Sequence, residues 1–140
     1  LGTMLIHINS KQKLAALQKE FSSYFPFLKL EFFRKKHNDM EGSAKRYLVS
    51  HDTSLSELLK VETDAEYVFS ADTTVSTIEQ DLETKFGLHA QVFRKSGNVW
   101  IETTLTDSWT LAHQNEEGQE LSSKGEDESA EDMADRDVWR

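Results

Sequence analysis

Apolar residues recur along this chain with a helical period and with a strand period, in the same order twice. Four apolar residues follow one another at spacings of three, four and four from Leu14 to Phe25, and four more do so from Val75 to Phe86. This spacing places an apolar stripe along one side of a helix. A short apolar segment precedes each helix, and the segment after it alternates apolar and polar residues, as on a strand with one buried face. The pattern therefore predicts strand, helix and strand in each half of the chain.

Signals at the ends of these segments refine the first half. Residues 4–8 form the first predicted strand, and Asn9 and Ser10 after it are interpreted as the N-cap of the helix. Pro26 ends that helix, because a proline cannot continue its hydrogen bonds. The remaining predicted elements are a strand at 28–33, a polar loop at 34–43, a return strand at 46–50, and a short helix at 55–60 that begins at a Ser54 and Glu57 capping box.

The second half contains the clearest local signal, a hairpin at residues 90–103. Gly87 stands where a left-handed residue usually ends a helix, and the alternating strand of the hairpin follows it. A two-residue turn at Ser96-Gly97 would place Phe93 opposite Trp100. One face of this hairpin is then apolar and packs on the preceding helix. The other face carries His89, Gln91, Phe93, Trp100, Glu102 and Thr104.

The two halves correspond closely enough to predict an internal duplication. The apolar helix positions match at a constant offset of 61, and Phe33-Arg34-Lys35 matches Phe93-Arg94-Lys95 at an offset of 60. Each copy is small for independent stability, so we expect the two copies to share one core. The predicted fold is a single α+β domain in which a pseudo-two-fold axis relates two β-α-β-β units, each followed by a short helix. Its strands form one antiparallel-rich sheet or two small packed sheets, with the long helices on one face.

The limits of the domain follow from where the apolar period begins and ends. Thr106 and Asp107 are interpreted as the cap of a last helix that begins at about Ser108, and the apolar period disappears from Glu116. A segment without such a period cannot bury enough surface to offset the entropy of ordering it. The predicted segments are a non-native remnant at 1–3, repeat one at about 4–60, repeat two at about 65–115, and an acidic, disordered tail at 116–140.

Composition narrows the classes of function. The chain has no Cys, which excludes disulfides, thiol nucleophiles and Cys-bearing zinc sites. The net charge is −9, but residues 1–60 hold ten basic against six acidic side chains, whereas residues 116–140 hold three against ten. This polarity favours self-association or pairing of the two halves over general affinity for nucleic acid. The sequence has neither a secretory signal nor an apolar run long enough for a membrane helix, so we expect a cytoplasmic protein without membrane contact.

Aromatic and basic residues of two strands form the candidate binding surface. If Phe93 and Trp100 are exposed, they form a platform that could stack nucleobases or hold a peptide. If a neighbouring element covers them, they are instead a cross-strand pair of the core. Net acidity and the lack of a Gly-aromatic RNA-binding motif weigh against nucleic acid. The candidate residues are Phe93, Arg94, Lys95, Trp100 and Trp109, together with Arg34, Lys35 and Lys36 of the first half.

Catalytic and metal chemistry has little support in the sequence. The five His lie on different predicted elements without the spacing of a metal site, and no nucleophile motif or Gly-rich phosphate loop occurs. Pairs of carboxylates, such as Asp72 with Glu79 and Glu102 with Asp107, are interpreted as helix caps and strand surface. We therefore expect no cofactor and no metal. An enzyme stays open only if both halves contribute to one pocket, for which His89, Glu102 and a charged residue of the first half are the candidates.

The run QVFRKSGNVWIETT, followed by TD, WTL and QN, resembles a small family of bacterial proteins to which no activity is attached. The resemblance covers roughly residues 65–118 and implies a bacterial cytoplasmic source. Our first hypothesis is a non-enzymatic protein-binding or assembly module that contacts a protein partner or a second copy. Single-stranded nucleic-acid binding through the aromatic and basic strand face is the alternative. A small-molecule enzyme with a site between the repeats is a weaker alternative.

Overall fold

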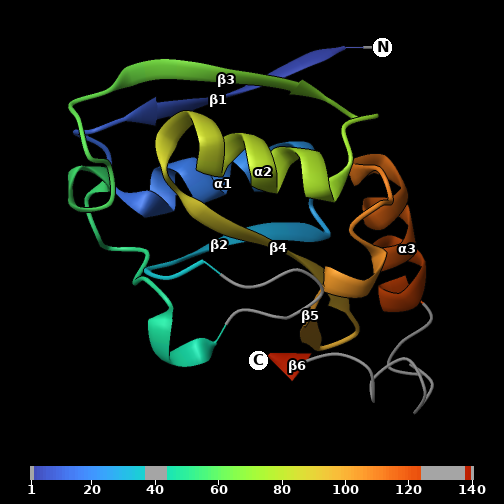
Figure 1. Ribbon diagram of the computed structural model, residues 1–140. Coiled ribbons are helices and arrows are strands. Elements are labelled where there is room, and N and C mark those ends of the chain that lie inside the picture. Colours follow the sequence, from blue (N-terminus) through green and yellow to red (C-terminus); the bar gives the residue numbers. More distant parts are fainter. Residues whose placement is uncertain (1, 37–43, 124–137, 140) are drawn as a thin grey trace.

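The computed structural model describes residues 2–36, 44–123 and 138–139, which form an α+β fold with two antiparallel sheets (Figure 1). The elements are β1 (Thr3–Asn9), α1 (Leu14–Tyr24), β2 (Leu28–Phe33), β3 (Asp64–Ser70), α2 (Val75–Phe86), β4 (His89–Ser96), β5 (Val99–Glu102), α3 (Leu111–Ser123) and β6 (Val138–Trp139). β1 pairs with β3 in one sheet, and the other sheet has the strand order β2-β4-β5-β6. The predicted α+β class is confirmed, and of the two arrangements left open, one antiparallel-rich sheet or two small sheets, the structure has two antiparallel sheets.

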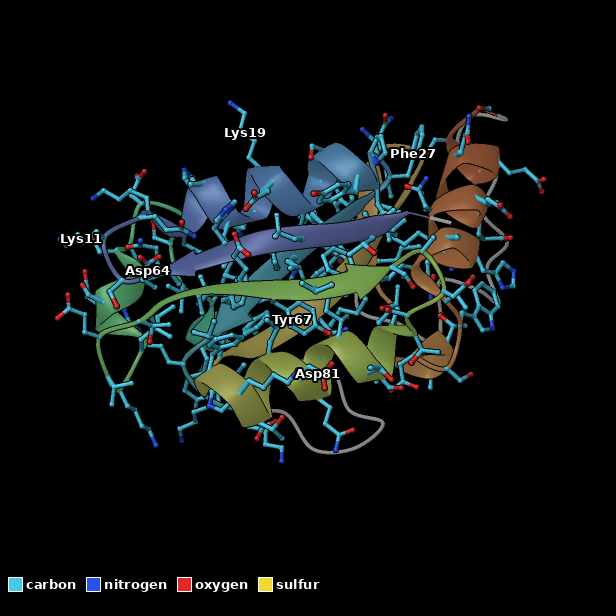
Figure 2. The ribbon with its side chains drawn as sticks, turned by 90° about the horizontal axis from the view of Figure 1, so that it is seen from above. Lys11, Lys19, Phe27, Asp64, Tyr67 and Asp81 are labelled. Atoms are coloured by element: carbon cyan, nitrogen blue, oxygen red, sulfur yellow. The ribbon has the colours of Figure 1, made fainter. Side chains whose placement is uncertain are left out.

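Each sheet pairs strands from different halves of the chain. Ile6 lies opposite Tyr67 in the β1–β3 pair, and Glu31 lies opposite Gln91 in the β2–β4 pair. Figure 1 shows α1 and α2 between the two sheets, and Figure 2 shows β1 and β3 side by side above them. α1 and α2 therefore lie together on one face of the four-stranded sheet, and they also contact the β1–β3 sheet on their other side. The reason is that β1 and β3 each bury one face, and the helices are the apolar surface that both strands share.

The predicted apolar stripes of the helices form the centre of the core. Phe21 of α1 stacks on Phe69 of β3, with ring centroids 6.1 Å apart. This contact joins the first half of the chain to the second through apolar surface that neither half could bury alone. The fully buried helix positions are Leu14, Leu17 and Phe21 on α1 and Val75, Ile78 and Leu82 on α2.

α1 and α2 begin differently. Thr74 caps α2 by accepting a hydrogen bond from the backbone N–H of Thr77, and Gly87 ends it with φ of 69°, as predicted. The predicted N-cap of α1 is wrong, because α1 begins only at Leu14. Asn9 and Ser10 serve the preceding turn instead. The Asn9 side chain accepts from the N–H of Lys11 at 2.8 Å, and the Ser10 hydroxyl accepts from the N–H of Thr63 at 2.7 Å.

The predicted return strand at 46–50 is a single bridge. Leu48 pairs with Phe33, and the N–H of Val49 donates to the carbonyl of Phe32 at 2.8 Å. A 3-10 helix, Lys45–Tyr47, lies where the strand was expected to begin. The segment touches the sheet at one point, where Val49 is buried and Leu48 is 39% exposed. The capping box at Ser54 is also wrong: a 3-10 helix, Leu55–Glu57, follows it without a side-chain cap. Of the predicted polar loop, residues 37–43 lie outside the described residues.

The hairpin turn lies one residue later than predicted. Ser96 pairs with Val99, so the two turn residues are Gly97 and Asn98. Gly97 has φ of 62°, a left-handed conformation that favours glycine, and this fixes its place in the turn. Each residue of β4 therefore faces a residue two positions further along β5 than predicted. Because side chains alternate with a period of two, every residue keeps its predicted face.

The predicted start of the tail at Glu116 is too early, because α3 continues to Ser123. The predicted start of this helix near Ser108 is early as well, since α3 begins at Leu111. The buried positions of α3 are Leu111, Gln114 and Gly118. A search for an apolar period misses the last two, because Gln114 is polar and Gly118 has no side chain. A Cβ on Gly118 would lie 2.9 Å from Cβ of Phe27, so the helix uses its glycine for close approach. Residues 124–137 and 140 of the tail, and Leu1 of the expected remnant, lie outside the described residues.

Candidate functional site

The predicted binding residues do not form one surface. Phe93 and Arg94 are buried, with 0% and 2% of their surface exposed, whereas Lys95, Trp100 and Trp109 are partly exposed. Neighbouring residues of a strand point to opposite faces, so Phe93 and Arg94 contribute to different sides of the sheet. The three basic residues of the first half, Arg34, Lys35 and Lys36, are exposed just after β2.

Trp100 lies at the edge of a small aromatic cluster on the face of the four-stranded sheet that points away from α1 and α2. Phe33 and Phe93 are its buried centre, and Tyr47 and Trp100 pack against them partly exposed. The ammonium group of Lys29 lies 4.7 Å from the centroid of a Trp100 ring, and that of Lys95 lies 5.7 Å from it. Cation–π attraction of this kind holds the two lysines over the ring. We call Trp100, Lys29, Lys95 and the adjoining edge of β5 the Trp100 surface.

Arg94 and Trp109 belong to the other face of the sheet, where α3 packs. The Arg94 guanidinium donates to the side-chain oxygen of Gln114 at 3.1 Å and lies 5.9 Å from the centroid of a Trp109 ring. Gln114 in turn donates to the carbonyl of Thr106 at 2.8 Å. This buried network connects β4 to α3 and to the turn before it. Trp109 stacks on His113 at a centroid distance of 4.2 Å, so it does not extend the Trp100 surface.

The basic residues after β2 diverge in the same way. The ammonium group of Lys35 lies 4.8 Å from the Tyr47 ring centroid, on the side of the aromatic cluster. Lys36 forms an ion pair with Glu83 of α2 at 3.2 Å, on the opposite side of the sheet. The sequence run Arg34-Lys35-Lys36 is therefore split between two faces of the sheet. Lys35 lies by the aromatic cluster, and Lys36 lies by α2.

The edge of β5 holds an extended segment from the far end of the chain. Trp100 pairs with Trp139 and Ile101 pairs with Val138, both antiparallel. Because Ser96 and Val99 close a two-residue turn, they exchange both ladder hydrogen bonds. The alternation of an antiparallel ladder then points the N–H and C=O groups of Trp100 away from β4 and toward β6.

A polar cavity of about 330 Å³ lies on the other side of the molecule, between α2, β4 and the turn that precedes α3. His89 and Lys36 are both in its lining, which meets the condition that the two halves contribute to one pocket. Glu102 does not line it, although Glu102 is buried nearby. The lining residues are Lys36, Ser76, Glu79, Gln80, Glu83, His89, Ala90 and Asp107.

Glu79 is a titratable group of this cavity whose acidity is strongly altered. Burial raises its pKa to about 8, an effect opposed by a hydrogen bond from the Val92 N–H and strengthened by the negative charges of Asp107 and Glu102. The Val92 nitrogen lies 2.9 Å from a Glu79 carboxyl oxygen. Perturbed acidity in a cavity is a common property of functional sites. The sequence analysis considered Glu79 beside Asp72 and Asp107 beside Glu102 as caps and strand surface, because nothing in the spacing of Glu79 and Asp107 shows that a helix and a distant turn bring them together.

Neither a metal centre nor a membrane segment is found in the described part of the chain. No group of three or more His, Asp or Glu there is arranged to hold a metal ion. None of its helices has the length and apolar character needed to cross a bilayer. Comparisons with protein-family models, with curated proteins and with solved structures return no match. The resemblance of residues 65–118 to a bacterial family thus stays a prediction.

Proposed function

We propose that this chain is a protein-binding module whose contact region is the Trp100 surface. The observation that supports it best is the pairing of β5 with Val138–Trp139, since this edge of the sheet receives an extended segment from a distant part of the chain. Adding a strand to a sheet edge is a recurring mode of peptide recognition, in which main-chain hydrogen bonds supply affinity and nearby side chains supply specificity. Trp100, Lys29 and Lys95 supply an aromatic and basic environment beside that edge.

The chain's own segment is a weak occupant of this edge. β6 has two residues, and each net backbone hydrogen bond contributes roughly 0.5–1.5 kcal/mol. Closing the connection from Ser123 to Val138 costs loop entropy, which partly offsets that gain. A longer extended segment of another protein makes more ladder bonds and displaces it. A partner with acidic residues beside its strand suits Lys29 and Lys95, whose ammonium groups lie beside Trp100.

We expect Trp139→Pro to open the β5 edge, because proline removes the N–H that faces Trp100. The test adds a synthetic peptide with the sequence of residues 131–140 to the full-length chain and follows the Trp100 amide signal by NMR. The peptide is expected to bind the variant roughly fivefold more tightly than the native chain, in proportion to one lost hydrogen bond. Val138→Pro is the matched control, since the N–H at that position points away from β5. Equal binding to all three chains, or signals that shift elsewhere, contradicts the assignment.

We also propose that the chain is an internal duplication with a pseudo-two-fold axis. The strand registers support it: Ile6 and Tyr67 face each other at the offset of 61, and Glu31 and Gln91 face each other at the offset of 60. Backbone hydrogen bonds also recur at the start of both helices, with donors at an offset of 61 and acceptors at an offset of 56. Leu14 donates to Thr53 and Val75 donates to Trp109, while Ala15 donates to His51 and Ser76 donates to Asp107.

Single-stranded nucleic-acid binding has less support. Phe93, the residue proposed to stack bases, is fully buried, and Arg94 is engaged by Gln114. Stacking and phosphate contacts both need exposed side chains. The exposed basic residues after β2 diverge to two faces of the molecule, as described above.

A small-molecule site is the second candidate, and the polar cavity favours it. Glu79, with its raised pKa, can hold a proton near neutral pH, and His89 and Lys36 line the same space from β4 and from the first half. Such a set could exchange a proton with a bound ligand. The experiment is a titration of the full chain with small amines and carboxylic acids, followed through the amide signals of Glu79 and His89. Signals that stay unchanged at about millimolar ligand exclude this use of the cavity.

A further inference from the structure

The two-stranded sheet has two outer edges, and the chain closes the edge of β1 with its own side chains. The hydroxyl of Tyr24 accepts from the N–H of Leu5 at 3.2 Å and donates to its carbonyl at 2.9 Å. The carboxylate of Glu20 accepts from the N–H of His7, and the amide of Gln12 donates to its carbonyl, both at 2.8 Å. The backbone groups of Leu5 and His7 that point away from β3 are therefore satisfied.

The edge of β3 lacks this protection. Val68 lies opposite Leu5, and Glu66 lies opposite His7. Both are non-hydrogen-bonded pairs of the ladder, so the N–H and C=O groups of Val68 and Glu66 also point outward. Within the described residues no group bonds to these four backbone atoms. The nearby side chains of α2 are engaged with Tyr67 instead. Asp81 accepts from the Tyr67 hydroxyl at 2.6 Å, and Lys85 lies 5.4 Å from the ring centroid; Figure 2 shows Tyr67 beside Asp81.

The edges of the four-stranded sheet are better covered. On β2, the carbonyl of Leu28 accepts from the hydroxyl of Ser22 at 2.9 Å, and the carbonyl of Leu30 accepts from the amide of Gln18 at 2.8 Å. On the far side, β6 pairs with β5. Proteins protect exposed strand edges because an open edge pairs with other chains. β3 is a seven-residue strand whose outer edge lacks the side-chain partners that β1 and β2 have, and this indicates a binding surface.

The side chains beside this edge define its partner. Val68 is 54% exposed, and the side chain of Glu66 is 58% exposed, with His7 3.6 Å away on the β1 side. Asp64 is exposed at the start of the strand. A second copy suits this edge poorly, because antiparallel pairing would bring two Glu66 carboxylates close together in chains that each carry a charge of −9.

We propose that β3 binds an extended segment of a partner protein that pairs antiparallel with it and carries an apolar residue beside Val68 and a basic residue beside Glu66. The segment adds a third strand to the β1–β3 sheet and satisfies the outward groups of both residues. This surface lies apart from β5, so it goes beyond the function proposed above and neither proposal rests on the other.

The test uses full-length, isotope-labelled protein and a synthetic probe, Thr-Val-Thr-Lys-Thr-Lys-Thr, which places Val opposite Val68 and Lys opposite Glu66 and Asp64. Binding is followed by NMR through the amide signals of Glu66 and Val68, with Trp100 as the internal reference for β5. We expect saturable binding that slows hydrogen exchange at Glu66 and Val68 and leaves Trp100 unchanged. Val68→Pro removes an outward N–H that the β1–β3 ladder does not use, and is expected to weaken binding at least tenfold.

A charge reversal keeps the proposal testable if Val68→Pro does not fold. Glu66→Lys is expected to lose affinity for the basic probe and to gain affinity for the probe in which both Lys are replaced by Glu. The proposal is overturned if the preference does not reverse, if Val68→Pro binds the probe as well as the native chain does, or if no signal at Glu66 and Val68 shifts at millimolar probe. It is also overturned if the protein dimerises without probe and Val68→Pro abolishes the dimer, since the edge then serves a second copy.

Discussion

One carboxyl group in the polar cavity ties the stability of this protein to pH. The pKa of Glu79 is about 8 in the folded chain, against an ordinary value of 4.5, because burial disfavours the ionised form. Between these two values the folded state binds a proton that the unfolded state has lost. The free energy of unfolding therefore falls as pH rises through this window.

We expect Glu79→Gln to remove this fall, which amounts to roughly 1–3 kcal/mol between about pH 5 and pH 8. Urea unfolding at a series of pH values measures it. Glu83→Gln, on the same helix and facing Lys36, is the control and should keep the native slope. A native chain whose stability does not decline over this range would show that Glu79 ionises normally.

At the scale of residues, the sequence predicts what depends on local pattern and misses what depends on neighbours. The buried stripe from Leu14 and the left-handed Gly87 follow from spacing and from backbone chemistry that adjacent residues define. Burial of Phe93 does not, because its cover comes from residues such as Phe33 that are distant in sequence. The same holds for Glu79, whose pKa is raised first by burial and then by the negative charge of Asp107, 28 residues further on.

At the scale of elements, α3 shows why an apolar period is not the only sign of a packed helix. Its buried positions, Leu111, Gln114 and Gly118, are spaced by three and four, but one is polar and one has no side chain. The polar one satisfies Arg94 inside the fold, and the glycine lets Phe27 approach.

The hairpin was more predictable, since the shift of its turn by one residue left every side chain on its expected face.

The close approach at Gly118 leads to a prediction opposite in sign to the usual one. Gly to Ala inside a helix normally stabilises by about 1 kcal/mol. Here a Cβ would lie 2.9 Å from Phe27 Cβ and 3.2 Å from the Lys95 carbonyl oxygen, so the helix must shift. We expect Gly118→Ala to destabilise the protein by roughly 1–2 kcal/mol, measured by urea unfolding. Gln119→Ala, exposed on the same helix, should change stability by less than about 0.5 kcal/mol.

At the scale of the whole molecule, the two strands of the first half cannot pair with each other and depend on the second half. β1 and β2 belong to the first half, and each pairs with a strand of the second. We expect residues 1–61 alone to be unfolded, and an equimolar mixture with residues 62–140 to regain the circular dichroism of the intact chain. The mixture should unfold at lower denaturant, because joining two chains costs additional entropy. A first half that is cooperatively folded on its own would contradict this arrangement of strands.

The pairing of β1 with β3 also sets when this protein can fold during its synthesis. Thr3 pairs with Ser70 and Asn9 with Asp64, so β1 waits for a partner strand that is made more than fifty residues later. Contacts so distant in sequence are slow to form, and exposed strands are prone to aggregation while they wait. The acidic residues of 116–140 are made later still, so they are not available to keep the nascent first half soluble. During that interval the charge near β1 comes from the lysines spaced along residues 11–36.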